Sequence, residues 1–427
     1  MMFELIKDKL DKLGAAGYAL TEKTENRWEF YFVRHKLDQN RAVVLKNYNV
    51  EIFKDIEDGK YLGSASGEID PTASEEEIDK KLDDIYFQAG FVKNPAYKLQ
   101  DKPVDVPDKT DPVDISAIAE DFIRAMQSAD ETETEDINSY EIFVKEIKRH
   151  FINSNGVTYT CTYPSSMIEV VINARREGHE IELYRNFTSG TCDPAKLKED
   201  VEKAMQFGKD RLIAVPTPKL ENIPVVFSND NAVAIYDYFI DRMSAGLKVR
   251  KLSDWTIGEP VAKEMNGDPI SIRAVALLPN SSMSVPVDEE GSVIRDKDLI
   301  KESIAADYWG SRQMNMYLGI TDSSLTYNFI VEGGRETEEE LRQGDYLEVL
   351  EFSDLQVDPV GGDFAGEIRL AYLYRNGEKI SVTGGSLSGS MSEAVKDLRF
   401  SKETVQYDRH VIPKVTRTTG LKITAAE

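Results

Sequence analysis

Residues 351–398, EFSDLQVDPVGGDFAGEIRLAYLYRNGEKISVTGGSLSGSMSEAVKDL, are the stretch from which the fold of this chain is best predicted. Proline and two glycines in residues 358–362 predict a chain reversal, because proline presets φ and glycine accepts positive φ. Residues 367–374 then alternate with a period of two, which predicts a strand. Asn376-Gly377 is typical of a two-residue hairpin turn, and residues 379–382 are the expected return strand.

A glycine-rich segment follows this hairpin, and we expect it to be a loop that enters a short helix. Ser390 and Glu393 have the spacing of a capping box at the start of that helix. Gly384, Gly385 and Ser386 are candidate peptide-binding residues, since exposed amides of such a loop can receive a carbonyl or an anion. The segment lacks the GK[ST] ending of a phosphate-binding loop, so a plain strand-to-helix connection is favoured over a phosphate site.

Composition limits the possible functions. A chain of 427 residues normally divides into two or more domains. The net charge of −24 argues against direct binding to nucleic acid or to an anionic membrane, since both require clustered cations. The only cysteines, Cys161 and Cys192, form no CxxC motif and predict neither a zinc knuckle nor a disulfide scaffold. No apolar run is long enough to span a membrane, and we expect a cytoplasmic protein.

The N-terminal half predicts an α+β layer of helices and antiparallel strands. Helices are expected over residues 3–13, 115–126 and 196–207, and a further helix begins at the capping box formed by Ser74 and Glu77. Strands are expected over residues 28–33, 42–45 and 50–54, and several more lie between residues 140 and 187, with a turn at Asn155-Gly156. Residues 98–114 contain three prolines and predict an extended surface connection.

Three prolines near residue 217 predict a domain boundary. We therefore expect an α+β domain over residues 1–217 and a β-rich domain over residues 218–427, the latter built on a curved or barrel-like antiparallel sheet.

The segment DPVGGDFAGEIRLAYLYRNGEKISVTGGSLSGSMSEAVKDL and the closing TRTTGLKITAA resemble the C-terminal signature of the TldD/PmbA family, whose members are called modulators of DNA gyrase. In catalytic members, a helix after the boundary carries HExxxH, in which two histidines bind zinc and the glutamate is the general base, and a cysteine near the C-terminus is a further ligand. The matching positions here are Tyr236, Asp237 and Asp241, and no cysteine follows Cys192. By this resemblance the chain is similar to the TldE/PmbA side of the family, which lacks the metal motif.

A relocated metal site is a weaker alternative. His179-Glu180 begins an HExxH whose second histidine is missing, and His410 lies near the position of the family's cysteine. Together with Asp241, these histidines would be the residues to test. A lone imidazole is more often structural than a ligand, so we expect no metal site and no cofactor in this chain.

Other chemistries have little support in the sequence. There is no GxSxG nucleophile elbow and no dinucleotide-binding fingerprint. Tyr308 and Met316 belong to an aromatic and methionine cluster that either lines a peptide cleft or packs in the core, and the core is the commoner place for such residues.

Two hypotheses for the function remain. The resemblance implies a non-catalytic, TldE-like subunit that pairs with a zinc-bearing TldD-like subunit in a cytoplasmic metalloprotease complex, which acts on peptides or unfolded proteins and has an indirect link to DNA gyrase. The alternative is a stand-alone homodimer that binds an extended peptide as an added strand without hydrolysis. Zinc would belong only to the catalytic partner, and no direct nucleic acid partner or membrane is expected.

Overall fold

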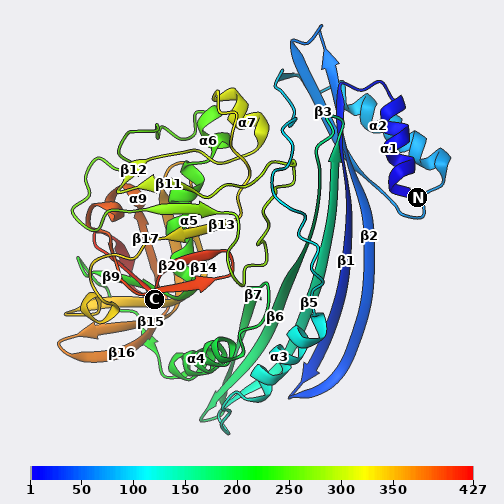
Figure 1. Cartoon of the computed structure of the whole chain (residues 1–427). Coiled ribbons are helices and arrows are strands. Elements are labelled where there is room, and N and C mark those ends of the chain that lie inside the picture. The colour runs from blue at the N-terminus through cyan, green and yellow to red at the C-terminus, as the bar shows by residue number, and fades with distance from the viewer. Residues whose placement is uncertain (1, 427) are drawn as a thin grey trace.

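The computed structural model describes residues 2–426, so Met1 and Glu427, the outer ends of the two predicted domains, lie outside the described residues. It confirms the α+β class. A long, curled antiparallel sheet occupies one side of the molecule, and a compact β-rich part occupies the other (Figure 1). No helix within the described part of the chain has the length and apolar character needed to cross a membrane.

The long sheet has seven strands in the order β4-β3-β2-β1-β5-β6-β7. Its members are β1 (Gly17–Val33), β2 (Lys36–Ile56), β3 (Tyr61–Ile69), β4 (Asn94–Pro95), β5 (Glu135–Asn153), β6 (Thr158–Arg176) and β7 (His179–Ser189). The predicted strands over 42–45 and 50–54 are one strand, and 28–33 is only the end of β1. Alternation failed to reveal these lengths because the polar segments between the apolar runs have no buried face to mark them.

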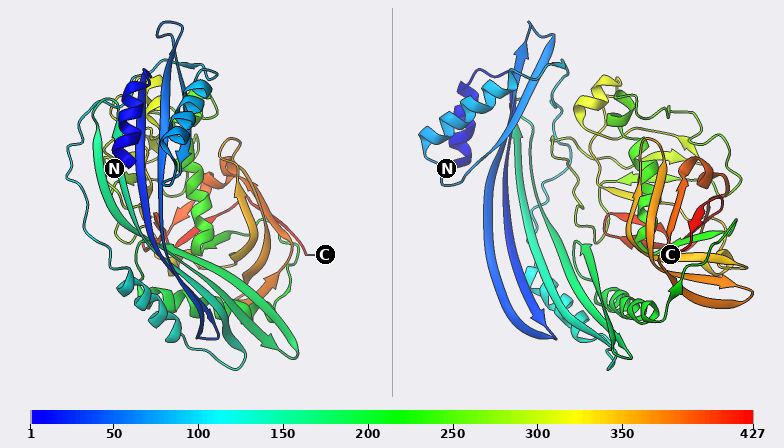
Figure 2. Two further views of the ribbon diagram at one scale, coloured as in Figure 1. Left: turned by 90° about the vertical axis from the view of Figure 1, so that its right-hand side faces the viewer. Right: turned by 180° about the vertical axis from the view of Figure 1, so that it is seen from behind.

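Helices cover this sheet at both ends. The helices α1 (Met2–Lys12) and α2 (Glu75–Ala89) pack near one end, whereas α3 (Ile115–Gln127) and α4 (Pro194–Leu212) lie near the other, with α4 between the sheet and the β-rich part (Figures 1 and 2). The predicted capping box of α2 is confirmed: the Ser74 hydroxyl accepts from the Glu77 amide, and the Glu77 carboxylate accepts from the Ser74 amide.

Two further sheets form the β-rich part, a six-stranded one ordered β12-β11-β10-β13-β20-β19 and a nine-stranded one ordered β18-β21-β9-β14-β15-β16-β8, with β17 and β22 paired beside β15. The strands are β8 (Val215–Pro216), β9 (Val225–Ser228), β10 (Ile272–Val275), β11 (Lys297–Lys301), β12 (Ile304–Ala305), β13 (Asn328–Val331), β14 (Tyr346–Val357), β15 (Asp363–Arg375), β16 (Glu378–Thr383), β17 (Ser386–Ser390), β18 (Arg399–Phe400), β19 (Thr404–Tyr407), β20 (His410–Pro413), β21 (Val415–Thr418) and β22 (Lys422–Thr424).

Short helices connect these strands: η1 (Asn229–Ala232), α5 (Val233–Arg242), α6 (Ala245–Val249), α7 (Arg312–Tyr317), α8 (Glu338–Leu341), α9 (Met391–Ala394) and η2 (Val395–Asp397). One face of the helix α5 packs in the core, with Phe239 and Ile240 buried among the side chains of both sheets. This packing fixes the orientation of the residues at the degenerate metal motif.

Two local predictions were wrong. Residues 386–390 are the strand β17, which pairs with β15 and β22 and is therefore no open loop. Nor do Ser390 and Glu393 form a capping box; the Ser390 hydroxyl instead accepts from the Ser392 amide. The sequence pattern does not predict this strand, because glycine and serine have low β propensity and because its pairing depends on β22, which is distant in the sequence.

The seven-stranded sheet contacts the β-rich part through a buried junction. One guanidinium nitrogen of Arg149 on β5 donates to the carbonyl oxygens of Val287 (2.5 Å) and Asp288 (3.2 Å). Tyr159 and Cys161 of β6 pack with Val285 and Val287 in one apolar cluster. The division at residue 217 stays a prediction, and the structure adds that β8, just before it, pairs with β16 of the β-rich part.

Candidate functional site

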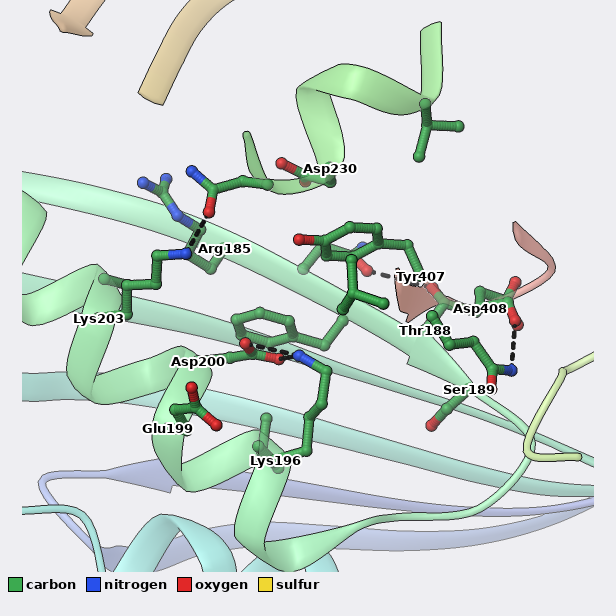
Figure 3. A pocket seen from close by; sticks show the side chains of 18 of the residues that line it. Arg185, Thr188, Ser189, Lys196, Glu199, Asp200, Lys203, Asp230, Tyr407 and Asp408 are labelled. Carbon is green, nitrogen blue, oxygen red and sulfur yellow. Dashed lines mark hydrogen bonds and ion pairs between the residues drawn. The ribbon is translucent and has the colours of Figure 1, made fainter. Parts of the chain in front are cut away.

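A cleft of about 1070 Å³ lies between the long sheet and the β-rich part. One wall consists of β7 and α4, and the other consists of η1, β14, β19 and the start of β20 (Figure 3). No sequence motif marks this cleft, because its walls come from segments that are separate in the chain and meet only in the folded protein.

Two sheet edges border the cleft. Strand β7 is the last strand of the seven-stranded sheet, and β19 is the last strand of the six-stranded sheet. Residues 184–189 of β7 and 404–407 of β19 line the cleft. A two-residue turn joins Tyr407 to His410, so the alternation of an antiparallel ladder directs the backbone groups of Thr404 and Gln406 away from β20. An extended chain placed in the cleft therefore meets unused backbone donors and acceptors.

Charged side chains of α4 project into the cleft (Figure 3). The Lys196 ammonium contacts both carboxylate oxygens of Asp200, at 2.8 and 2.7 Å. Burial raises the pKa of Asp200, and the neighbouring lysines oppose that shift. Lys203 donates to the Asn229 side chain, and burial lowers the pKa of its ammonium. The main cations of the cleft are thus already engaged within the protein.

Tyr407 and Cys192 line the cleft as un-ionised side chains that are poor nucleophiles. Burial raises the pKa of Tyr407, and the carboxylates of Asp230, Asp200 and Glu199 raise it further, so the phenol stays protonated. Burial likewise raises the pKa of the Cys192 thiol to about 12. A thiol with that pKa is almost entirely un-ionised at neutral pH and makes a poor nucleophile.

The degenerate metal motif lies on α5, behind the cleft wall. Tyr236 is fully buried, and its hydroxyl is 2.6 Å from the Thr416 hydroxyl of β21. Asp237 is half-exposed and lies 3.1 Å from Nε2 of His410, whose side chain lines the cleft. Burial raises the pKa of Asp241 to about 6, the Asp237 charge adds to the shift, and His410 opposes it.

The structure therefore brings His410 to the motif helix but leaves His179 elsewhere. His179 is exposed at the start of β7, opposite Arg176 in the β6–β7 hairpin. Within residues 2–426, no group of three or more histidine, cysteine, aspartate or glutamate side chains has an arrangement that holds a metal ion. The combination of His179, His410 and Asp241 is accordingly not assembled.

The candidate peptide-binding residues do not line the cleft. Gly384 and Gly385 form the tight turn before β17, and Ser386 pairs with Thr424 of β22. Tyr308 is buried and donates to the Trp255 carbonyl oxygen at 2.7 Å, which agrees with the core interpretation. Met316 lies on α7, whose last residue, Tyr317, donates to the Pro95 carbonyl oxygen at the end of β4. Their role in peptide binding stays a prediction, and none of these residues lines the cleft.

Comparison with known proteins supplies the family. Residues 220–424 match the family model described as the PmbA/TldA metallopeptidase C-terminal domain. This C-terminal part of the chain belongs to the TldD/PmbA family. A comparison with curated protein sequences finds no match.

Three solved structures have a similar fold over the whole chain. TldE from Thermococcus kodakarensis superposes with a TM-score of 0.78 at 17% identity and covers 100% of both chains. A "putative modulator of a DNA gyrase" from Thermotoga maritima has a TM-score of 0.77 at 15% identity, covering 99% of this chain and 100% of that one. A "putative modulator of DNA gyrase" from Bacteroides thetaiotaomicron has a TM-score of 0.78 at 15% identity, covering 99% and 98%.

The zinc that the TldD/PmbA resemblance implies for catalytic members does not fit the residues present in this chain. At the first motif position, the Tyr236 phenol is bonded to Thr416 in the core, so it is not available as a ligand. At the other positions there are two carboxylates, and zinc sites favour nitrogen and sulfur donors in a three-ligand protein set. No catalytic step can be assigned through zinc here.

Proposed function

We propose that this chain is a non-catalytic, TldE-like peptide-binding subunit that acts with a zinc-bearing TldD-like chain in peptide or unfolded-protein degradation. Two features of the same chain support this proposal. The cleft is bordered by the edge strands β7 and β19, and the helix α5 has no histidine or cysteine that could bind zinc. In this proposal the protein acts in the cytoplasm. It makes no direct contact with nucleic acid, because its net charge of −24 repels phosphate backbones. Any link to DNA gyrase is then indirect.

Binding of a peptide as an added strand explains how such a cleft would bind peptides of many different sequences. Main-chain hydrogen bonds give affinity without reading side chains, and the pockets on either side of the strand set preferences. The edges of β7 and β19 offer such bonds, and Phe187, Phe207 and Tyr407 provide apolar surface between them.

A stand-alone peptide-binding pseudoenzyme is the second candidate. It is favoured by the fact that both walls of the cleft come from one chain, so peptide binding needs no partner. The two candidates differ in whether a chain with an intact HExxxH is needed for turnover.

Titration of the purified chain with a fluorescent unstructured peptide tests peptide binding at β19. Thr404→Pro removes one amide donor at the open edge, and we expect the dissociation constant to rise about 2- to 10-fold, the worth of one hydrogen bond. Thr404→Ala removes the side chain but keeps the amide, and it should bind like the original chain. Equal affinity in all three proteins would contradict strand addition at β19.

A second experiment separates the two candidates. The peptide is incubated with this chain, with a zinc-bearing HExxxH relative, and with both, and cleavage is followed by mass spectrometry. Cleavage that requires the zinc-bearing chain and increases when this chain is added supports the subunit role. Binding without any effect on that cleavage supports the stand-alone alternative.

A further inference from the structure

The ammonium of Lys203 on α4 faces the cleft without a carboxylate partner (Figure 3). Its Nζ donates to the side-chain oxygen of Asn229, which is neutral, and it makes no ion pair within residues 2–426. Burial lowers the pKa of this ammonium, because the surrounding protein removes part of its hydration. A partly desolvated charge without a counterion is unfavourable, and a ligand that supplies the counterion is correspondingly favoured.

Two carboxylates lie close enough to act on the charge of Lys203, but each already has a cation of its own. Asp200 is contacted by Lys196 at 2.7 Å. Glu348 is only 4% exposed and is contacted by Arg342 at 2.9 Å. Because both pairs are neutral overall, they leave the charge of Lys203 uncompensated.

Two contacts join the opposite walls of the cleft beside this ammonium. Lys203 of α4 contacts Asn229 of η1, and Arg185 of β7 forms an ion pair with Glu351 of β14. The two contacts are adjacent, because the Asn229 side chain also donates to the carbonyl oxygen of Leu350, the residue before Glu351, at 3.5 Å. The walls of the cleft therefore meet at this place.

This meeting of the walls lies at one end of the cleft. Residues 184–189 of β7 line the cleft, and Arg185 is near the start of that stretch. In Figure 3, Arg185 and Lys203 lie toward one side of the cleft, and Ser189 lies toward the other. A peptide that extends along β7 must end or turn outward at Arg185, so this closed end is suited to a chain terminus.

The charges at the closed end favour a carboxylate over an ammonium group. Glu351 is contacted by Arg185 through one oxygen, and Arg211 lies 3.9 Å from its other oxygen. Asp230 acts on the same arginine as a second carboxylate, and Lys203 adds a third cation. Cations thus outnumber carboxylates here, although the whole chain has a net charge of −24, and a terminal ammonium would be repelled.

We propose that Lys203 binds the C-terminal carboxylate of a peptide held in the cleft. The inference rests on the proposed peptide binding and specifies its substrate: chains with an accessible carboxyl end, in place of internal segments of longer chains. A peptide offers a carboxylate either at its C-terminus or on an aspartate or glutamate side chain. The closed end selects the terminus, because an internal acidic residue would require the chain to continue past Arg185.

Fluorescence anisotropy of the full chain with three alanine–serine peptides, each labelled at the amino end, tests this assignment. The first peptide ends in a free carboxylate, and the second ends in a carboxamide. The third also ends in a carboxamide but has an aspartate at its centre, so it carries the same charge as the first. A charge-assisted hydrogen bond strengthens binding by about tenfold or more, so the first peptide should bind at least about tenfold more tightly than the other two.

Lys203→Met removes the ammonium but keeps an unbranched side chain, and this variant should bind all three peptides with the affinity that the original chain has for the carboxamide. Lys209→Met is the matched control. Lys209 is on the same helix, outside the cleft and 3.9 Å from Glu135, so its loss should leave the preference unchanged. Circular dichroism confirms that each variant is folded, and the comparison of the three peptides on the original chain depends on no variant.

The outcomes separate this inference from the proposed function. Equal binding of the first two peptides by the original chain would overturn the carboxylate site and leave peptide binding intact. Equal binding of the first and third would overturn the choice of the terminus, and a preference that persists in Lys203→Met would overturn the role of Lys203. Binding of none of the three would refute the proposed peptide binding and this inference with it.

Discussion

Nε2 of His410 lies 3.1 Å from Oδ1 of Asp237, which joins the strand β20 to the helix α5. The imidazole also stacks on Phe329, with ring centroids 5.6 Å apart. The pair thus connects the six-stranded sheet to the helix that carries Tyr236, Asp237 and Asp241.

We expect the purified chain to bind well below one zinc ion per molecule. The residues at the motif offer two carboxylates and one imidazole, and no three-ligand group is assembled within residues 2–426. Inductively coupled plasma mass spectrometry after dialysis against zinc measures this. Stoichiometric zinc that disappears in His410→Ala would contradict the prediction and locate the site.

Asp241→Asn should flatten the dependence of stability on pH. The pKa of Asp241 in the folded protein is about 6, against 3.8 as its ordinary value, so the folded state holds this proton more tightly than the unfolded state. Stability therefore falls as pH rises from about 4 to about 6, and it falls by about 1 kcal/mol once solvent screening of this partly exposed group is considered. Urea unfolding at pH 4, 5, 6 and 7 measures the free energy; equal slopes in both proteins would refute the assignment.

Gly385→Ala should destabilise the fold far more than Gly377→Ala. Both glycines have positive φ, +73° and +79°, so alanine costs about 1 kcal/mol at either one. A Cβ at Gly385 would also lie 2.2 Å from the Thr424 carbonyl oxygen, whereas at Gly377 it meets no atom within 4 Å. We expect an additional loss of about 1–3 kcal/mol at Gly385, measured by denaturant unfolding. Similar losses at both sites would show that β17 and β22 separate easily.

Tyr236→Phe should cost about 1–2 kcal/mol of unfolding free energy. It removes one member of a buried hydroxyl pair and leaves the Thr416 hydroxyl unsatisfied in the core. Combining it with Thr416→Val removes both hydroxyls, and the double variant should be more stable than the sum of the single losses predicts. Strict additivity in thermal and urea unfolding would mean that the two hydroxyls do not interact.

Local sequence identified most of the elements. The Asn376-Gly377 turn is the connection between β15 and β16, and the capping box at Ser74 opens α2. The helix α5 lies where the family resemblance implies a helix, at Tyr236, Asp237 and Asp241. These features depend on residues within a few positions of each other, where propensity and periodicity act.

Local sequence did not predict the elements whose pairing strands are distant in the chain. The strand β17 looks like a glycine-rich loop until β22 pairs with it, and β2 looks like two strands because its middle has no buried face. The glycine-rich segment predicts peptide-binding residues at Gly384, Gly385 and Ser386, but the cleft is lined by β7, α4 and β19, which carry no motif.

The sequence by itself determined the resemblance to the family and the residue types at Tyr236, Asp237 and Asp241, because both depend on which residues stand at fixed spacings along one helix and one hairpin. The tertiary structure alone decided which strands are sheet edges, that His410 meets Asp237, and that β7 and β19 enclose a cleft. The physical reason is that an edge or a cavity is defined by what a strand lacks on one side, and that depends on the packing of segments far apart in the chain.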